Sequence, residues 1–349
     1  MAKSVLIILF QVSFFVLKSF GQSNEISPIY LTGYTFSKGT SEIGYVKIRS
    51  ANGAQIQAIT LEGQSAKAFK ISKAHKLSAT KKVNADTQWM DLVLNVKTST
   101  GNLLDTFRIV NDAFIRNKVI AHRGAWKNTV ATENSVASLK HAITIGCEGS
   151  EFDVHMSSDS VLFIHHDPAV NGVSIAKSGF DVLRSIKLSN GEILPTLEEY
   201  LNAGIAQNKT KLILEIKTSE LGKASSLALT NKVVQLVEKL HAQGWVDYIA
   251  FDYDVCKEVM KIAPYAKVSY LNGDKAPAEL AQNNFYGLDY HFNVFKKNLD
   301  WIKEAQQNKL TVNVWTVNDK AMMEDLLQQN VDFITTNEPE LLLNIIAGK

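Results

Sequence analysis

The sequence predicts an α/β protein whose larger part is a TIM (β/α)8 barrel, preceded by a small all-β sandwich. Short alternating segments separated by glycines fill residues 24–115, and from residue 117 onward strand-like runs alternate with helix-like runs. Alternating β and α units indicate a parallel sheet. Eight such units in roughly 250 residues are typical of a closed barrel, and eight strand-like runs fit into the remaining length of this chain.

The composition is that of a globular protein. Of the 349 residues, 46% are hydrophobic and 21% are charged, which excludes extended disorder. Lys and Arg number 37 against 35 Asp and Glu, so the chain has no basic excess of the kind that binds nucleic acid. We therefore expect no nucleic-acid partner.

Residues 1–21 have the features of a secretory signal peptide. Lys3 precedes an apolar run from Val5 to Leu17, and Ser19 and Gly21 are small residues at the spacing of a cleavage site. A membrane anchor is the alternative, but this run is shorter than the roughly 20 residues that cross a bilayer. Cleavage would leave 35 basic and 35 acidic residues and no stable membrane span. We expect a bacterial protein exported to the periplasm or the extracellular space.

The predicted sandwich occupies residues 22–115. Segments such as 45–50 and 89–99 are rich in Val, Ile, Thr and aromatic residues, with apolar and polar positions alternating. Short strands with turn signals every 8–12 residues are typical of such a domain. His75 is its only histidine and no catalytic cluster is evident. Carbohydrate binding, docking to the barrel and a spacer role all stay open, and a protein partner is not identified.

The predicted barrel occupies residues 116–349. Its strand candidates are 118–122, 149–155, 211–217, 248–252, 266–270, 285–289, 310–317 and 331–336. The helical segments expected between them are 134–145, 225–243, 255–262, 277–283, 294–307, 320–329 and 338–346. A doubly wound open sheet is the alternative, but no glycine-rich dinucleotide motif follows the first strand.

Polar residues fall at or near the carboxyl ends of these strands, where barrel enzymes place their active sites. They are His122, Glu151, Asp153, His166, Glu215, Lys217, Asp252 and Trp315. Side chains two residues apart on a strand share a face. Glu151 and Asp153 therefore point the same way, and so do Glu215 and Lys217.

Three carboxylates at one end of a barrel repel each other and need positive charge beside them. Unpaired buried carboxylates cost several kcal/mol each, and Mg²⁺ or Ca²⁺ prefers such oxygen ligands. We expect Glu151, Asp153 and Glu215 to hold one divalent cation, with open positions for water and substrate oxygens. An ion-pair network around Lys217 and Arg123, without a metal, is the alternative.

Two histidines and two cations complete a set that suits a phosphate ester. His122 lies in the run AHRG and His166 in HHD; two imidazoles beside one reacting atom can serve as general base and general acid. Arg123 and Lys217 offer charges that match phosphate oxygens. His155 and His165 are not included in this pair, because each falls on the wrong strand parity or one residue before the expected position.

The run at 119–167 resembles the glycerophosphodiester phosphodiesterase signature, in which HRG, an EN pair, an ExD strand and an HD follow in that order. Later landmarks of the family match 194–201, 212–217, 314–319 and 334–342, so the resemblance covers residues 118–346. It implies a TIM-barrel hydrolase of the phospholipase-C-like phosphodiesterase superfamily. Such an enzyme uses Ca²⁺ or Mg²⁺ to cleave glycerophosphodiesters into glycerol 3-phosphate and an alcohol. The chain departs from the family pattern at Asn337, where an acid is usual.

The resemblance also implies a role for each matching residue. His122 and His166 match the catalytic acid–base pair, and Trp315 matches a residue near the glycerol. The remaining matches are the metal ligands Glu151, Asp153 and Glu215 and the phosphate contacts Arg123 and Lys217. Two alternatives stay open: a phospholipase D-like or inositol-phospholipid-cleaving relative, and a catalytically idle binding protein. Whether Cys147 and Cys256 pair is not determined, and two small buried residues are the simpler interpretation.

Overall fold

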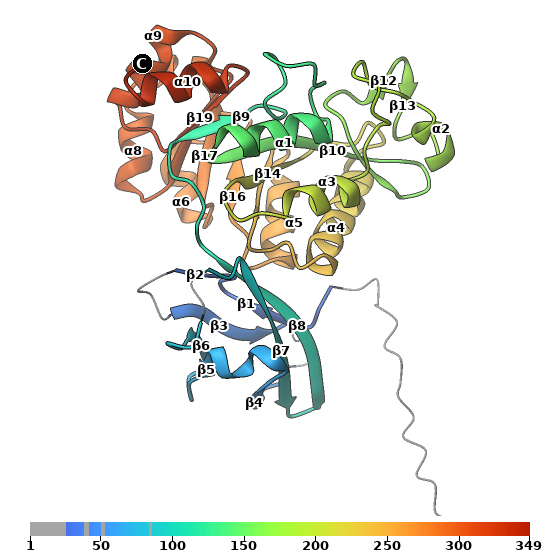
Figure 1. The fold of residues 1–349 in the computed structure, drawn as a ribbon, viewed down its shortest axis with the longest axis vertical. Coiled ribbons are helices and arrows are strands. Elements are labelled where there is room, and N and C mark those ends of the chain that lie inside the picture. The colour runs from blue at the N-terminus through green and yellow to red at the C-terminus, as the bar shows by residue number, and fades with distance from the viewer. Residues whose placement is uncertain (1–25, 38–41, 50–52, 84–85) are drawn as a thin grey trace, which may run out of the picture.

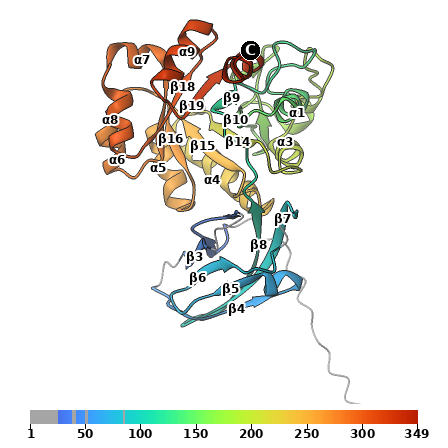
Figure 2. The same ribbon diagram turned by 60° about the vertical axis from the view of Figure 1, so that its left-hand side comes forward.

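The computed structural model describes residues 26–37, 42–49, 53–83 and 86–349. Two sheets formed by the N-terminal part lie beneath a barrel of parallel strands surrounded by helices (Figures 1 and 2). This arrangement confirms the predicted fold class. The predicted signal peptide at residues 1–21 lies outside the described residues.

The N-terminal part has two four-stranded sheets. Their orders are β1-β3-β6-β5 and β2-β8-β7-β4. In β7, Leu92, Leu94 and Val96 are fully buried between the sheets, so inward and outward residues alternate as the sequence predicts. The strand bounds are β1 Ile29–Leu31, β2 Thr35–Phe36, β3 Glu42–Ile48, β4 Ile56–Glu62, β5 Phe69–Ile71, β6 Lys76–Ala79, β7 Trp89–Thr98 and β8 Gly101–Asn111.

The barrel closes because its first strand pairs with both its second and its last. β9 is parallel to β10 on one side and to β19 on the other, and each predicted strand segment overlaps one barrel strand. β11 (Leu162–Ile164) adds an antiparallel strand to β10. The barrel strands are β9 Val119–Ala121, β10 Gly149–Met156, β14 Lys211–Ile216, β15 Val246–Ala250, β16 Val268–Tyr270, β17 Gly287–His291, β18 Thr311–Trp315 and β19 Phe333–Thr336.

The helices around the barrel follow the predicted order with one error. The segment predicted as a single helix at 294–307 is two helices, and Asn298 separates them. Its amide donates to the carbonyl of Val294 at 2.9 Å, and its backbone leaves the helical region at φ −129°; such side-chain bonds compete with a continuing helix. The helices are α1 Val136–Ile145, α4 Lys223–Lys239, α5 Tyr253–Ile262, α6 Pro277–Gln282, α7 Phe292–Lys297, α8 Trp301–Gln307, α9 Lys320–Gln328 and α10 Pro339–Ile346.

The segment between β11 and β14 is more structured than the sequence predicts. It contains β12 (Ala169–Val170), β13 (Val173–Ser174), α2 (Phe180–Arg184) and α3 (Leu197–Gly204), and it has a small apolar core of its own. The hydroxyls of Thr132 and Ser189 lie 2.7 Å apart, which ties this segment to the loop after β9. The segment therefore stands beside the carboxyl ends of the first barrel strands.

The sandwich docks on the opposite end of the barrel. Trp89 packs edge-on against Trp245 at 5.9 Å, and Tyr34 against Tyr265 at 5.0 Å. The amide of Asn208 donates to a backbone carbonyl of β8 at 2.9 Å. These barrel residues directly precede β15, β16 and β14, so the contact lies at the amino ends of the strands. Among the described residues, these contacts between sandwich and barrel lie at the end opposite the carboxyl ends of the strands.

An ion pair anchors this contact and provides a test of it. Arg49 Nη2 lies 2.6 Å from Oε1 of Glu238 on α4, and the same oxygen accepts from the Tyr265 hydroxyl at 2.9 Å. Arg49→Ala would leave Glu238, which is 9% exposed, without its counter-charge. We expect a loss of about 3 kcal/mol in the free energy of unfolding, measured in urea. Lys76→Ala, which breaks the exposed pair with Glu42, is the control and should cost less than about 1 kcal/mol. Equal small losses would contradict the anchoring role.

Two further expectations concern the cysteines and membrane insertion. Cys147 and Cys256 are both free and buried, which agrees with the simpler interpretation of the sequence. In the part of the chain that the structure describes, no helix has the length and apolar character needed to cross a membrane.

Candidate active site

A cavity of about 150 Å³ lies at the carboxyl ends of the barrel strands. Six of the eight predicted site residues line it: His122, Arg123, Glu151, His166, Glu215 and Trp315. The other two lie beside it, because Lys217 Nζ is 2.7 Å from Glu215 Oε1 and 3.2 Å from Asp153 Oδ1. The structure therefore brings all eight residues to one place.

Three buried carboxylates converge from neighbouring strands. Glu151 and Asp153 lie on β10 and Glu215 lies on β14, with Asp153 directly opposite Glu215 in the strand pairing. One oxygen from each lies within 4.8 Å of the others. An ion bound to oxygens at about 2.0–2.6 Å would fit among atoms at this spacing.

The charges around the carboxylates are incompletely balanced by the protein. Burial, reinforced by Asp153, raises the pKa of Glu215 to about 8 and holds that of Glu151 well above its usual range. Burial also acts to raise the pKa of Asp153, but Lys217 and its other positive neighbours outweigh it and lower that pKa. Glu151 Oε1 is buried with no hydrogen-bond partner among the described residues. The ion-pair network alone therefore leaves this oxygen without a hydrogen-bonding or ion-pair partner in the part of the chain that the structure describes. A divalent cation held by the three carboxylates would supply one.

His122 follows β9 and is held as a neutral base. Its Nδ1 lies 2.7 Å from the amide oxygen of Asn337, and its Nε2 lies 4.0 Å from Oε2 of Glu151. Because an amide oxygen only accepts, Nδ1 carries the hydrogen and Nε2 keeps its lone pair. Burial, and then the charge of Arg123, lowers the pKa of His122 to about 4. The ring is therefore unprotonated at neutral pH, and its Nε2 lone pair is available to a proton donor.

His166 reaches the same cavity from the turn after β11. Its Nδ1 lies 2.7 Å from the carboxylate of Asp167, and its side chain is one-third exposed. The pair with Asp167 leaves Nε2 as the ring nitrogen available for proton exchange. The two histidines are delivered by different strands to one cavity, which is the arrangement that an acid–base pair requires.

The turn after His122 holds the carboxylates in place. Arg123 adopts a left-handed backbone at φ 57°, and its N–H donates to Glu151 Oε2 at 2.9 Å. Gly124 is also left-handed at φ 78°, and a Cβ there would lie 2.8 Å from the backbone of Ser138 on α1. The amide of Asn134 donates to Asp153 Oδ2 at 2.8 Å. The HRG and EN runs therefore orient two of the three carboxylates.

An aromatic wall completes the cavity. The indole N–H of Trp315 donates to the backbone carbonyl of Asp289 at 2.9 Å. With this N–H engaged, Trp315 presents its apolar ring surface to the cavity. Phe251 packs edge-on against that ring at 5.6 Å, and His291 does so at 5.1 Å. The guanidinium of Arg123, by contrast, lies 3.0 and 3.1 Å from the two oxygens of Glu133. The cavity thus has one charged side and one apolar side.

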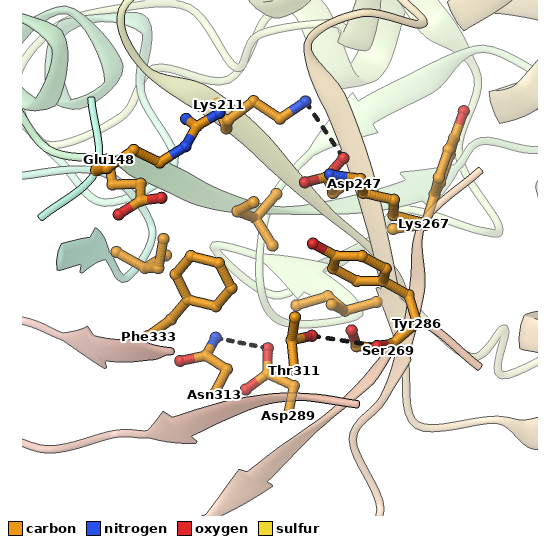
Figure 3. A pocket seen from close by; sticks show the side chains of 15 residues that line it. Glu148, Lys211, Asp247, Lys267, Ser269, Tyr286, Asp289, Thr311, Asn313 and Phe333 are labelled. Atoms are coloured by element: carbon orange, nitrogen blue, oxygen red, sulfur yellow. Dashed lines mark hydrogen bonds and ion pairs between the residues drawn. The ribbon is translucent and has the colours of Figure 1, made fainter. Parts of the chain in front are cut away.

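The floor of the cavity is an acid that the sequence reasoning did not single out. Asp289 is 3% exposed, its Oδ2 accepts from Asn313 at 2.9 Å, and its Oδ1 has no partner among the described residues. Burial raises its pKa to about 7. A second cavity of about 110 Å³ borders Asp289 on the side of Lys211 and Asp247 (Figure 3). Asp289 therefore separates the site from a hollow in the lower barrel.

Comparison with known proteins identifies the barrel. The chain matches the "Glycerophosphoryl diester phosphodiesterase family" over residues 122–341. The chain belongs to this family. The motif-based resemblance is thereby confirmed, and the chain is an enzyme of the phosphoric diester hydrolase class.

Similar proteins come from several bacteria. A crystal structure of a glycerophosphodiester phosphodiesterase from Parabacteroides distasonis is 41% identical and covers 67% of this chain and 98% of its own, with a TM-score of 0.65. The glycerophosphodiester phosphodiesterase of Caldanaerobacter subterraneus subsp. tengcongensis is 29% identical over 249 residues, 66% of this chain and 98% of its own length. A phosphodiesterase from Oleispira antarctica in complex with the product sn-glycerol-3-phosphate is 23% identical and covers 66% and 96%, with a TM-score of 0.58. At that identity it supports the fold.

Within this glycerophosphodiester phosphodiesterase barrel, sequence reasoning missed several supporting residues. His155 was set aside by parity, yet it shares the parity of Glu151 and Asp153, and its Nε2 lies 3.1 Å from the carbonyl of His166. Asn134 and Asn337 lie in motifs that the sequence does reveal, but the sequence does not indicate which group each side-chain amide contacts. Asp252, counted among the strand-end groups, instead caps α5 by accepting from the N–H of Asp254 at 2.8 Å.

Proposed function

We propose that this chain is an exported, divalent-metal-dependent glycerophosphodiester phosphodiesterase that releases glycerol 3-phosphate and an alcohol. The observation that carries the proposal is the convergence of three buried carboxylates with two histidines at one cavity. Glu151, Asp153 and Glu215 would hold Mg²⁺ or Ca²⁺, which supplies positive charge to the phosphate oxygens. The signal-peptide pattern of residues 1–21 supports export.

The protein's own groups account for the proton transfers and for substrate orientation. Neutral His122 accepts at Nε2 the proton of the hydroxyl whose oxygen attacks phosphorus, and the bond from phosphorus to the alcohol oxygen breaks. Attack by water gives glycerol 3-phosphate directly, whereas attack by the neighbouring glycerol hydroxyl gives a cyclic phosphate that a water then opens. His166 donates a proton from Nε2 to the departing alkoxide, while its Nδ1 is held 2.7 Å from the Asp167 carboxylate. Arg123 and Lys217 add positive charge toward the phosphate oxygens, which favours the transition state electrostatically. The Trp315 ring offers an apolar surface for the glycerol carbons.

A substrate panel tests this function. The mature chain is incubated with glycerophosphocholine, glycerophosphoinositol and a lysophospholipid, and glycerol 3-phosphate is measured with a coupled dehydrogenase. We expect release from the two water-soluble diesters. Release of phosphocholine in place of glycerol 3-phosphate, or no cleavage of any diester, would overturn the proposal. Cleavage of the lysophospholipid alone would favour the phospholipid-acting relative.

Metal binding should also release protons. In the metal-free protein the pKa of Glu215 is about 8 and that of Glu151 is well above normal, so at pH 7 the folded chain retains protons that a metal ligand must lose. We expect the apparent affinity for Mg²⁺ or Ca²⁺ to rise with pH up to about 8. Calorimetry at pH 7 in buffers of different ionisation enthalpy measures the release directly. Identical binding enthalpies in all buffers would contradict the prediction.

A further inference from the structure

The turn that carries His166 is fastened to the metal-binding strand at two points. The backbone N–H of His165 donates to the carbonyl of Asp153 at 3.1 Å. The Nε2 of His155 lies 3.1 Å from the carbonyl of His166 itself. Both attachments come from β10, the strand that carries Glu151 and Asp153.

We infer that His155 is a positioning residue, which fixes His166 relative to the carboxylates through this second attachment. The inference rests on the proposed function, because it assigns His155 a role only if His166 exchanges a proton with the substrate. A carbonyl oxygen only accepts, so Nε2 of His155 is the donor.

The location of His155 suits a fixed connection. Its side chain is 6% exposed, and its backbone pairs with Phe163 of β11. β11 ends at Ile164, so the strand leads almost directly into His166. A buried donor on a rigid strand loses little freedom when it forms a hydrogen bond, and an unpaired buried carbonyl would cost about 1–3 kcal/mol.

His166 needs such support because its other contacts are exposed. Its side chain is 33% exposed, and its ring partner Asp167 is 69% exposed. An exposed pair of this kind contributes little rigidity. A displacement of about 1 Å at a reacting group can cost about 10²-fold in rate. The hydrogen bond from His155 holds the backbone from which the His166 ring projects.

Two amide substitutions test the hydrogen bond itself. In His155→Gln the side-chain N–H₂ can reach the place of Nε2, whereas in His155→Asn it is too short. Both are neutral and polar, but Asn is one methylene smaller, so His155→Met, which has the length of Gln and no N–H donor, controls for packing and should lose as much kcat as His155→Asn. We expect kcat for glycerophosphocholine to fall about 10- to 100-fold in His155→Asn, and to recover most of that loss in His155→Gln. KM and metal affinity should change little between the two variants, whereas Tm should be lower in His155→Asn, which leaves the buried carbonyl of His166 unpaired.

A double-mutant cycle shows whether the effect passes through His166. His155→Asn and His166→Ala are measured singly and together, with His141→Asn as control; His141 pairs with Glu340 at 3.1 Å outside the cavity. We expect the double variant to be no slower than His166→Ala, and the control to keep wild-type kcat. Additive losses, or equal kcat for the Gln and Asn variants, would overturn the positioning role. Full turnover by His166→Ala would instead overturn the proposed role of His166.

Discussion

Turnover of glycerophosphocholine should fall about 10²- to 10⁴-fold when either His122 or His166 is replaced by Ala, the usual worth of a positioned acid or base. Both rings border the cavity that holds the carboxylates, and each has its Nδ1 engaged by a neighbouring oxygen. The loss should appear in kcat, because neither imidazole is needed to bind the metal. The measurement is steady-state kinetics at saturating Mg²⁺ or Ca²⁺.

The control for the histidine pair is His141→Ala on α1, outside the cavity. We expect His141→Ala to turn over glycerophosphocholine at the wild-type rate. If either His122→Ala or His166→Ala retains wild-type kcat with glycerophosphocholine, the assignment of that histidine is wrong. A loss seen only in KM would indicate a role in binding instead of proton transfer.

Replacing Glu215 by Gln should produce the other large effect. The substitution keeps the shape of the side chain but removes one of the three carboxyl groups that would ionise to hold the ion. It leaves Lys217 with Asp153 as its remaining carboxylate partner in the cluster. Several kcal/mol of electrostatic stabilisation depend on the bound ion, and about 4 kcal/mol corresponds to about 10³-fold in kcat/KM. We expect a loss of this size together with weaker binding of Mg²⁺ or Ca²⁺ in calorimetry.

The matched control for Glu215 is another buried carboxyl of the barrel. Glu148 borders the lower cavity and accepts from the N–H of Lys118 at 2.7 Å. Glu148→Gln should leave metal affinity and kcat/KM close to wild type. Normal metal affinity and normal activity in Glu215→Gln would show that this carboxylate is not a ligand.

Much of the barrel was predictable because its strands are buried on both faces and read as short apolar runs. Where polar residues interrupt such runs near the carboxyl end, strand parity places Glu151 and Asp153 on one face. The pairing of Asp153 with Glu215 across β10 and β14 brings the third carboxylate to them. The helix predicted at 294–307 was wrong because periodicity alone does not reveal that the Asn298 side chain bonds back to the preceding turn.

The supporting residues were harder to predict for a physical reason. Asn337 contacts His122 across 215 positions of sequence, and Asn134 contacts Asp153 across 19. Such contacts depend on how loops meet at the end of the barrel, which no local pattern encodes. His155 is different, because it lies two residues after Asp153 on β10 and therefore shares the face of Glu151 and Asp153. The docking of the sandwich through Arg49 and Glu238 likewise leaves no signal in either segment alone.

The central claim is that acids from β10 and β14 hold one divalent cation between two imidazoles that act on a phosphodiester. The most direct test measures glycerol 3-phosphate release from glycerophosphocholine by the mature chain after chelation, and again after Mg²⁺ or Ca²⁺ is added back. We predict that chelation abolishes release and that one of these ions restores it. Undiminished release by protein shown by elemental analysis to be free of metal would contradict the claim.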